Sequence, residues 1–259
     1  MTVRFTRALV RKPPASVAKG LRAVDRGAPS YEGVQAEHAA YVAALERAGL
    51  QVETLAPLDL LPDSLFVEDP ALVFTEGAIL LRPGAPSRRR EAEALRPDLA
   101  ARFEALVVLP GPGAVDGGDV LVLGDRVLIG LSARTDAAGA EAVIAALPAF
   151  GKRGEIVRTP PGVLHLKSDC APLGEAAVLS TARLAASGIF DGLEVQQVPE
   201  GEEPAANALR LNDHILIADG YPKTAEMLEK TGCAVTALPT AEIAKIDAGL
   251  SCLSLRWAD

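Results

Sequence analysis

The sequence predicts an α/β fold in which strand–strand–helix–strand units repeat around a ring, as a five-fold pseudo-symmetric α/β propeller. Short polar turns containing Gly, Asn or Asp recur near residues 76, 125, 174 and 213. This period of roughly forty to fifty residues is typical of repeat architectures. Apolar segments flank each turn, helical patterns lie between the hairpins, and another strand pattern follows several helices. An ordinary α/β sandwich with hairpins fits the same pattern.

Each strand prediction rests on a short apolar run beside a turn whose residues tolerate positive φ. The expected hairpins are 71–74 with 78–81, 119–123 with 126–129, 171–173 with 176–179, and 208–211 with 214–218. The expected third strands are 50–55, 106–109, 155–158, 193–198 and 233–238. The opening segment 3–10 and the closing segment 250–257 are predicted to complete a fifth unit. No Pro- or Ser-rich linker divides the chain, so we expect one domain over residues 1–259.

Three helices are predicted, over residues 31–48, 87–95 and 222–231. The first carries apolar residues at helical spacing along one face, and Gly49 follows it as a C-cap. The second ends near Pro97. The third has Pro222 near its start and Gly232 just past its end, which is the usual asymmetry of helix ends.

Composition excludes several classes of protein. The 259 residues are 49% hydrophobic, which excludes intrinsic disorder. Lys and Arg total 26 against 34 Asp and Glu, so a net charge of −8 disfavours nucleic acid and favours a cationic small molecule. The apolar runs are too short to span a membrane, and the N-terminus lacks the apolar region of a secretion signal. Cys170, Cys233 and Cys252 form no CxxC pair, which indicates a cytoplasmic location.

The histidines and cysteines supply the candidate reactive groups. His38 is expected on a helix surface, and His214 is expected to be structural. His165 lies in an alternating segment, 163–168, which would place it either on a strand facing a polar cavity or on an exposed edge strand. Cys252 together with a distant His is the usual footprint of a thiol nucleophile, although burial in an apolar core is the default for cysteine.

Two further segments carry charged residues where core residues are expected. Segment 62–70 holds Asp63, Glu68 and Asp69 beside Phe66, and carboxylates buried there require a cation. Gly117-Gly118 fits no phosphate-binding spacing and is expected to bend the chain so that Asp116 projects from a loop. No pair of His or Cys residues has the spacing of a metal site, so no metal is expected.

Six motifs occur in order between about residue 60 and residue 255: FVED (66–69), RPGAPSRR (82–89), DGGDV (116–120), LSART (131–135), LHLKS (164–168) and IDAGLSC (246–252). Together they resemble the dimethylarginine dimethylaminohydrolase family. The resemblance implies the pentein fold, a ring of five ββαβ-type units around a polar central channel. It also implies hydrolysis of Nω-methylated arginine, a small cationic amino acid, to citrulline and methylamine or dimethylamine, with no metal or organic cofactor.

The resemblance also implies a role for each candidate residue. Cys252 corresponds to the nucleophile, His165 to the general acid and base, and Asp116 to the carboxylate that orients the histidine. Asp119, the nearby rival, is expected to be structural. The residues implied to contact substrate are Asp63, Phe66, Glu68, Asp69 and Asp247 around the guanidinium, Arg88 and Arg134 at the α-carboxylate, the main-chain carbonyl of Ile246 at the α-amino group, and Leu21 in a lid.

Two alternatives stay open at this stage. Arginine deiminases share the fold but typically carry an acidic residue two positions after the histidine, where this chain has Lys167. A non-catalytic pentein, such as a ribosome anti-association factor, would use the ring as a binding surface, which the retained Cys252, His165 and Asp116 disfavour. The sequence leaves open whether the protein is a monomer or a homodimer.

Overall fold

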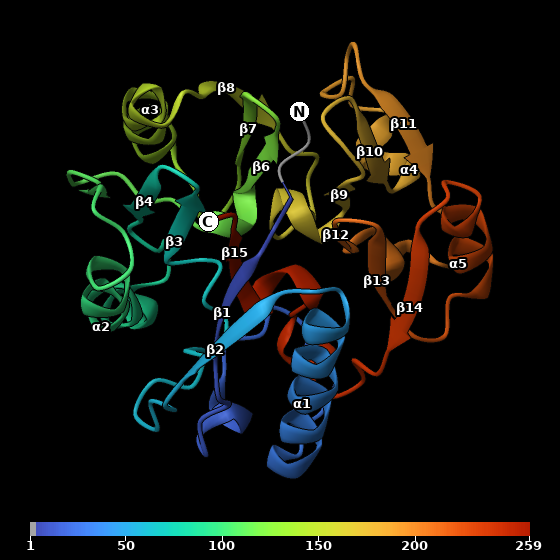
Figure 1. Cartoon of the computed structure of the whole chain (residues 1–259), viewed down its shortest axis with the longest axis horizontal. Helices are drawn as coiled ribbons and strands as arrows, with labels where there is room; N and C mark the ends of the chain where they lie inside the picture. Colours follow the sequence, from blue (N-terminus) through green and yellow to red (C-terminus); the bar gives the residue numbers. More distant parts are fainter. Residues whose placement is uncertain (1–3) are drawn as a thin grey trace.

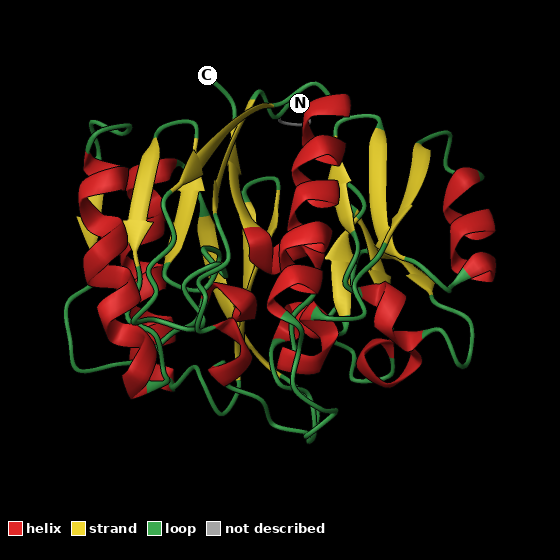
Figure 2. Cartoon of the chain, turned by 90° about the horizontal axis from the view of Figure 1, so that it is seen from below, coloured by secondary structure: helices red, strands yellow, loops and turns green. Residues whose placement is uncertain are grey.

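The computed structural model describes residues 4–259 and places their fifteen strands in five three-stranded sheets. In every sheet the middle strand pairs antiparallel with one neighbour and parallel with the other. A helix connects the two parallel strands of each sheet, as a parallel pair requires. Figure 1 shows the sheets arranged in a ring, with the helices outside them, and Figure 2 shows the same arrangement from the side. The predicted five-fold propeller of ββαβ units is confirmed.

The units are numbered in chain order. The first contains β3 (Ala71–Phe74), β4 (Gly77–Leu80), α2 (Arg89–Ala100) and β5 (Leu106–Val108). The second contains β6 (Val120–Leu123), β7 (Arg126–Leu131), α3 (Ala137–Ala146) and β8 (Arg153–Arg158). The third contains β9 (Cys170–Pro172), β10 (Ala177–Ser180), α4 (Ala182–Ala185) and β11 (Glu194–Gln197). The fourth contains β12 (Leu209–Leu211), β13 (His214–Ala218), α5 (Pro222–Glu229) and β14 (Ala234–Leu238).

The two ends of the chain build the fifth unit together. It contains β15 (Ser254–Trp257), β1 (Arg7–Arg11), α1 (Tyr31–Arg47) and β2 (Gln51–Leu55). In its sheet Leu9 pairs with Leu255 across the antiparallel ladder and with Glu53 across the parallel one. Of the predicted opening strand, Val3 lies outside the described residues, and the strand itself begins at Arg7.

Short 3₁₀ helices precede or interrupt the regular elements. Those in the described residues are η1 (Val17–Lys19), η2 (Pro86–Arg88), η3 (Gly117–Asp119), η4 (Leu147–Phe150), η5 (Leu166–Ser168), η6 (Glu203–Ala206), η7 (Ile243–Ile246) and η8 (Leu250–Leu253). Because of η3 and η8, the strands predicted over 119–123 and 250–257 begin later, at Val120 and Ser254.

The sequence analysis missed the helices of the second and third units. Helix α3 is mostly alanine, so no polar face alternates with an apolar one at helical spacing, although Asp136 caps it by accepting a hydrogen bond from the Gly139 N–H. Helix α4 has only four residues, which is too short for any periodicity. The prediction for His38 was also wrong. Its side chain is buried inside the fifth unit, to which α1 belongs, and burial lowers the pKa of His38 to about 4.

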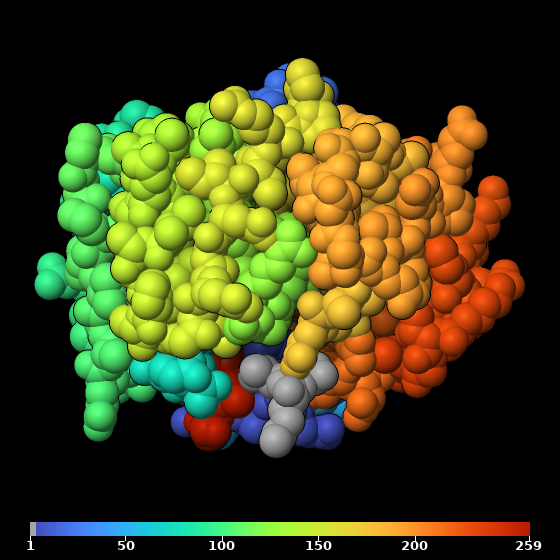
Figure 3. Space-filling model, turned by 90° about the horizontal axis from the view of Figure 1, so that it is seen from above, coloured from blue at the N-terminus to red at the C-terminus, as the bar shows by residue number. Residues whose placement is uncertain are grey.

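The hydrophobic core consists of five clusters, and each one joins two neighbouring units. One representative pair from each cluster is Phe74 with Ile129, Leu121 with Val178, Leu179 with Ile217, Leu45 with Leu216, and Leu80 with Trp257. The space-filling view shows the second and third units packed side by side in one continuous surface (Figure 3). Each fully buried aliphatic side chain contributes about 1.5–3 kcal/mol, so every unit depends on both neighbours and the ring closes.

The first strand of each unit faces the ring axis. Residues of β3, β6, β9, β12 and β15 together line a cavity of about 250 Å³. The hairpin turns lie around this cavity, and the polar segments that precede the inner strands lie at the other end of the axis. None of the helices in residues 4–259 has both the length and the apolar composition that crossing a membrane requires.

Candidate active site

The candidate functional side chains converge because each lies in the segment that precedes the inner strand of its unit. Each unit enters its inner strand from the same end of the ring, so the preceding segments meet near the axis. The first unit brings Glu68 and Asp69 there, and the second brings Asp116 and Asp119. His165 precedes the inner strand of the third unit, and Cys252 precedes that of the fifth.

His165 lies in a turn and not in the predicted strand. The residue has extended φ and ψ of −134° and 153°, and η5 begins directly after it. The ring Nε2 lies 3.1 Å from Oδ2 of Asp116, which is fully buried and accepts a second hydrogen bond from the Gly84 N–H at 2.8 Å. A Cβ at Gly118 would stand 2.8 Å from His165 Nδ1, so the imidazole requires glycine there. The predicted bend is present as the 3₁₀ turn η3 at Gly117–Asp119, and the close approach of His165 is a further reason for glycine at position 118.

The electrostatic surroundings of His165 favour its charged form. Burial alone would lower the pKa of the imidazole, but Asp69, the hydrogen bond to Asp116, and Asp119 together raise the pKa of His165 to about 9. His165 is therefore an imidazolium at neutral pH in this structure. The side chain is 12% exposed, so it can be reached from outside.

Asp119 anchors the turn that carries His165, as the sequence analysis expected of a structural residue. Its carboxylate accepts hydrogen bonds from Ser132 Oγ at 2.6 Å, Thr135 Oγ1 at 2.7 Å and the Leu166 N–H at 2.9 Å. The residue is fully buried. The pKa of the Asp119 carboxyl is raised overall, because the effect of burial exceeds the lowering by His165 and by these three donors.

Asp119→Ala is expected to lower the free energy of unfolding by about 3 kcal/mol, because two buried donors and the half-buried Ser132 hydroxyl lose their acceptor. The measurement is denaturant unfolding at pH 7. Asp125→Ala, which removes an acid from an exposed pair with Arg153, serves as the control and is expected to leave the unfolding midpoint unchanged. Equal midpoints for wild type and Asp119→Ala would contradict this assignment.

Cys252 lies in η8, whose preceding residue Gly249 accepts a hydrogen bond from the Cys252 N–H at 3.3 Å. The Cys252 carbonyl accepts from the Glu68 N–H at 3.3 Å, which fixes the turn beside the acidic segment. Burial, followed by the charges of Glu68 and Asp69, raises the pKa of the thiol to about 12. Cys252 is therefore a neutral thiol at neutral pH. The Glu68 N–H bonds the Cys252 carbonyl, and a carboxylate oxygen of the next residue, Asp69, lies within 4.8 Å of a His165 ring nitrogen, so residues 68–69 contact the Cys252 turn and lie beside His165.

Arg88 neutralises this part of the acidic cluster. Its guanidinium pairs with Asp69, donates to Glu91 at 2.8 Å and donates to the Phe66 carbonyl at 3.0 Å. Burial raises the pKa of Asp69, but Arg88, His165 and the Gly118 N–H outweigh it and bring the value to about 2. Arg88 is buried among these acceptors, and its expected contact with a substrate carboxylate stays a prediction.

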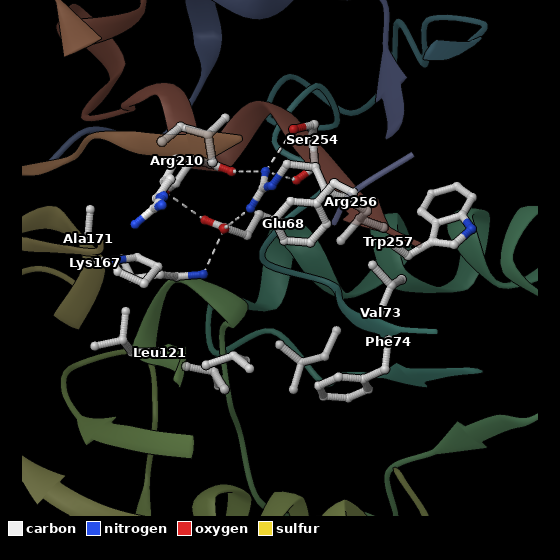
Figure 4. Close-up of a pocket in the computed structure, with 18 of the residues that line it drawn as sticks. Glu68, Val73, Phe74, Leu121, Lys167, Ala171, Arg210, Ser254, Arg256 and Trp257 are labelled. Carbon is white, nitrogen blue, oxygen red and sulfur yellow. Dashed lines mark hydrogen bonds and ion pairs between the residues drawn. The ribbon is translucent and has the colours of Figure 1, made fainter. Parts of the chain in front are cut away.

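Glu68 lines the cavity and is bonded through its backbone to the Cys252 turn. It pairs with Lys167 at 2.7 Å and Arg256 at 3.3 Å, and it accepts a hydrogen bond from Ser251 Oγ at 2.9 Å. Figure 4 shows Glu68 between Lys167 and Arg256 at the wall of the cavity. Cys252, His165 and Asp116 do not line that cavity, so this ion-paired group lies between it and the reactive residues. Sequence reasoning did not anticipate these partners of Glu68.

Two other residues predicted to contact substrate, Asp63 and Asp247, accept hydrogen bonds from the backbone of the segment that follows η1. The Leu21 N–H donates to Asp63 at 2.9 Å, and the Ala23 N–H donates to Asp247. Leu21 itself is 37% exposed. Asp247 adopts a positive φ of 55° directly after the buried Ile246.

The surroundings of Asp63 include two cations and a ring. Burial raises the pKa of Asp63, and the charges of Arg88 and the half-buried Arg134 lower it. Phe66 is buried, with its ring centroid 5.9 Å from the Arg88 guanidinium carbon. Asp63 and Phe66 thus lie beside Arg88, the ion-pair partner of Asp69, and the charge of Arg134 acts on Asp63.

One group among residues 4–259 has ligand atoms close enough for a metal ion. Oxygens of Asp69 and Asp116 and a nitrogen of His165 lie within 4.8 Å of one another. Asp69 is paired with Arg88, and Asp116 bonds the imidazole. The charges of these carboxylates are therefore already compensated by protein cations.

Comparison with known proteins identifies the family. The chain is 37% identical over 254 residues to the N(G),N(G)-dimethylarginine dimethylaminohydrolase of Pseudomonas aeruginosa, covering 98% of this chain and 100% of that enzyme. The chain belongs to the dimethylarginine dimethylaminohydrolase family. The member from Streptomyces coelicolor is 35% identical, with 96% of each chain covered.

Solved structures and a family model agree with this membership. A cysteine-to-serine variant of the Pseudomonas aeruginosa dimethylarginine dimethylaminohydrolase, complexed with citrulline, superposes with a TM-score of 0.94 at 36% identity. The alignment covers 98% of this chain and 99% of that one. The sequence model of arginine deiminase matches residues 54–160. The resemblance seen in the sequence is thereby confirmed over the whole chain.

Proposed function

We propose that this dimethylarginine dimethylaminohydrolase family member hydrolyses Nω-methylated arginine, asymmetric dimethylarginine and monomethylarginine, to citrulline and dimethylamine or methylamine. The observation that carries the proposal is that residues 68–69 contact the turn that carries Cys252 and also lie beside the His165–Asp116 pair. Enzymes named for this reaction match the chain over almost its full length, and one of them was solved with citrulline. No metal or organic cofactor takes part in the proposed reaction.

Binding of the substrate is assigned to the acidic residues and two arginines. A guanidinium is planar and permanently charged, so it pairs with carboxylates through two parallel hydrogen bonds. We assign this role to Asp63, Glu68, Asp69 and Asp247, and we assign the α-carboxylate to Arg88 and Arg134. Arg88 also pairs with Asp69 and Glu91, which holds Asp69 in place. The Ile246 carbonyl is proposed for the α-amino group, with Phe66 as a wall and Leu21 as the lid.

In the first half-reaction the Cys252 thiol gives its proton to solvent as the cationic substrate binds, and the thiolate sulfur attacks the guanidino carbon. The bound cation offsets the charges of Glu68 and Asp69 that otherwise raise the pKa of the thiol. The carbon–sulfur bond forms, and the bond from the carbon to the methylated nitrogen breaks. The imidazolium of His165 gives its proton to the departing amine, so the amine leaves neutral.

In the second half-reaction neutral His165 takes a proton from water, whose oxygen attacks the thioether-bonded carbon. The carbon–sulfur bond breaks, the O–H proton of the adduct passes to the departing sulfur, and citrulline and the Cys252 thiol are released. The hydrogen bond that Nε2 donates to Asp116 keeps the ring in one orientation during both steps. His165 thus gives a proton in the first half-reaction and takes one back in the second.

The test of the substrate is citrulline release from arginine, monomethylarginine and asymmetric dimethylarginine under identical conditions. The methylated compounds are expected to react with kcat/KM at least about tenfold above that for arginine, a discrimination of about 1.4 kcal/mol. A preference for plain arginine would favour the arginine deiminase alternative, which the family model over residues 54–160 raises.

The raised pKa values predict how Cys252 responds to pH in the free enzyme. Thiolate is the reacting form, so a thiol pKa of about 12 means that alkylation by neutral iodoacetamide rises continuously from pH 7 to pH 10. The cation 2-chloroacetamidine is expected to react at least about tenfold faster at pH 7, because its charge offsets the nearby carboxylates. Both rates are measured by mass spectrometry of the peptide that contains Cys252. A plateau for iodoacetamide below pH 8 would contradict the assignment.

We also propose that residues 1–259 act as one domain in the cytoplasm, as a monomer or a homodimer. The sharing of one sheet by both chain ends supports the single domain. The free thiols of Cys170, Cys233 and Cys252 support a reducing compartment.

A further inference from the structure

Asn207 connects the turn after His165 to the turn that carries Cys252. Its Nδ2 donates to the Lys167 carbonyl at 2.7 Å and to Ser251 Oγ at 3.2 Å. Its Oδ1 accepts from the Ser251 N–H at 3.1 Å. Both N–H groups and the oxygen of one amide are therefore used between these two turns.

The place of Asn207 in the fold matches that of the reactive residues. It follows η6 and stands two positions before β12, the inner strand of the fourth unit. Asp69 stands two positions before β3, and Cys252 stands two positions before β15. Asn207 thus occupies in the fourth unit the position at which the first unit carries Asp69 and the fifth unit carries Cys252.

We propose that Asn207 is a positioning residue that sets Cys252 relative to His165, an inference that rests on the proposed function. His165 and Cys252 belong to different units and have no direct backbone connection near the site. Asn207 bonds Lys167, which is two residues after His165, and Ser251, which is one residue before Cys252. A displacement of about 1 Å between reacting groups costs about 10²-fold in rate, so such a link matters to chemistry more than to substrate affinity.

Gly249 shows how tightly the Cys252 turn packs on this amide. A Cβ at Gly249 would lie 2.4 Å from Cγ and Oδ1 of Asn207 and 2.9 Å from Nδ2. The backbone of Gly249 is extended, with φ −128°, which any residue adopts. The glycine is therefore required by the contact with Asn207 and not by backbone conformation.

The first test compares Asn207→Ala with wild type in steady-state hydrolysis of monomethylarginine. We expect kcat to fall about 10²-fold while KM changes less than about threefold, because the link acts between reacting groups. Inactivation by 2-chloroacetamidine is expected to slow about tenfold, while labelling by iodoacetamide, which needs only the thiol, changes less than about threefold. The matched control is Asn212→Gly, which removes a similar side-chain bond to the Phe5 carbonyl on a hairpin turn and is expected to keep wild-type rates.

The second test is a double-mutant cycle with Gly249→Ala. In wild type this substitution is expected to reproduce the loss of kcat, because the new methyl group displaces the Cys252 turn. In the Asn207→Ala background it is expected to add less than about threefold, since the opposing amide is gone and effects at contacting residues are not additive. Full additivity in the cycle would overturn the proposal.

The outcomes separate this inference from the proposed function. Wild-type hydrolysis with an unchanged kcat in Asn207→Ala would overturn the role of Asn207 alone. Absence of citrulline release in wild type would overturn the proposed function, and the ratio of the two alkylation rates would still test Asn207. Equal slowing by both electrophiles, in step with a lowered melting temperature, would make Asn207 merely structural and overturn the inference.

Discussion

Replacing Cys252 by serine is expected to lower kcat for monomethylarginine at least about 10³-fold, because the substitution removes the nucleophile on which both half-reactions depend. Serine is nearly isosteric with cysteine, so the hydrogen bonds between Cys252 and Glu68 or Gly249 through the backbone are retained. The expected loss is therefore chemical, and the melting temperature is expected to stay close to that of wild type. Citrulline release under saturating substrate is the measurement.

The matched control is Cys233→Ser, which changes a half-buried thiol far along the chain at the start of β14. This variant is expected to keep wild-type kcat and to be labelled by 2-chloroacetamidine at Cys252. Retained hydrolysis in Cys252→Ser, or labelling at Cys233 in place of Cys252, would show that another group attacks the substrate.

Replacing His165 by asparagine is expected to reduce kcat by about 10²–10⁴-fold, the usual worth of a general acid and base. The reason is that the imidazole of His165, whose pKa is raised to about 9, bonds Asp116, lies beside Asp69 and is the proposed proton donor to the leaving amine. With S-methyl-thiocitrulline, whose thiol leaving group needs little protonation, the first half-reaction is expected to proceed and the second to stall. Intact-mass spectrometry would then show a covalent adduct that persists.

His214→Asn serves as the control, since His214 lies in β13 on a hairpin and contacts none of the proposed reacting groups. It is expected to keep wild-type turnover and to form no lasting adduct. Wild-type turnover in His165→Asn would disprove the general acid and base role. A variant that loses turnover but never forms the adduct would assign His165 to thiol activation alone.

The ring could be predicted because its evidence is local. A hairpin turn at residues 124–125 or 212–213 has the same chemistry in any fold, and its recurrence indicated repeats. Helix α1 carries a clear apolar face and a capping Ser30, so its bounds differed from the prediction only at the end. The alanine-rich α3 lacks such a face, and packing against β7 and β8 decides its conformation.

The candidate site could be predicted as a set of residues but not as an arrangement. The motifs named Cys252, His165 and Asp116, and the structure then placed His165 against Asp116. The partners of Arg88 and Glu68 could not be read from spacing, because they come from segments up to 188 residues away in the chain. Alternation along 163–168 predicted a strand, and the hydrogen bond from the Leu166 N–H to Asp119 favours a turn in its place.

By itself, the amino-acid order determined the repeat, the approximate positions of the strands and the chemical types of the reacting groups, since each depends on neighbours within a few residues. Only the folded ring decided which charges meet. The protonation of His165, the neutral thiol of Cys252 and the link through Asn207 all depend on distances between units. Electrostatic and hydrogen-bond energies vary steeply with those distances, and closure of the ring is what sets them.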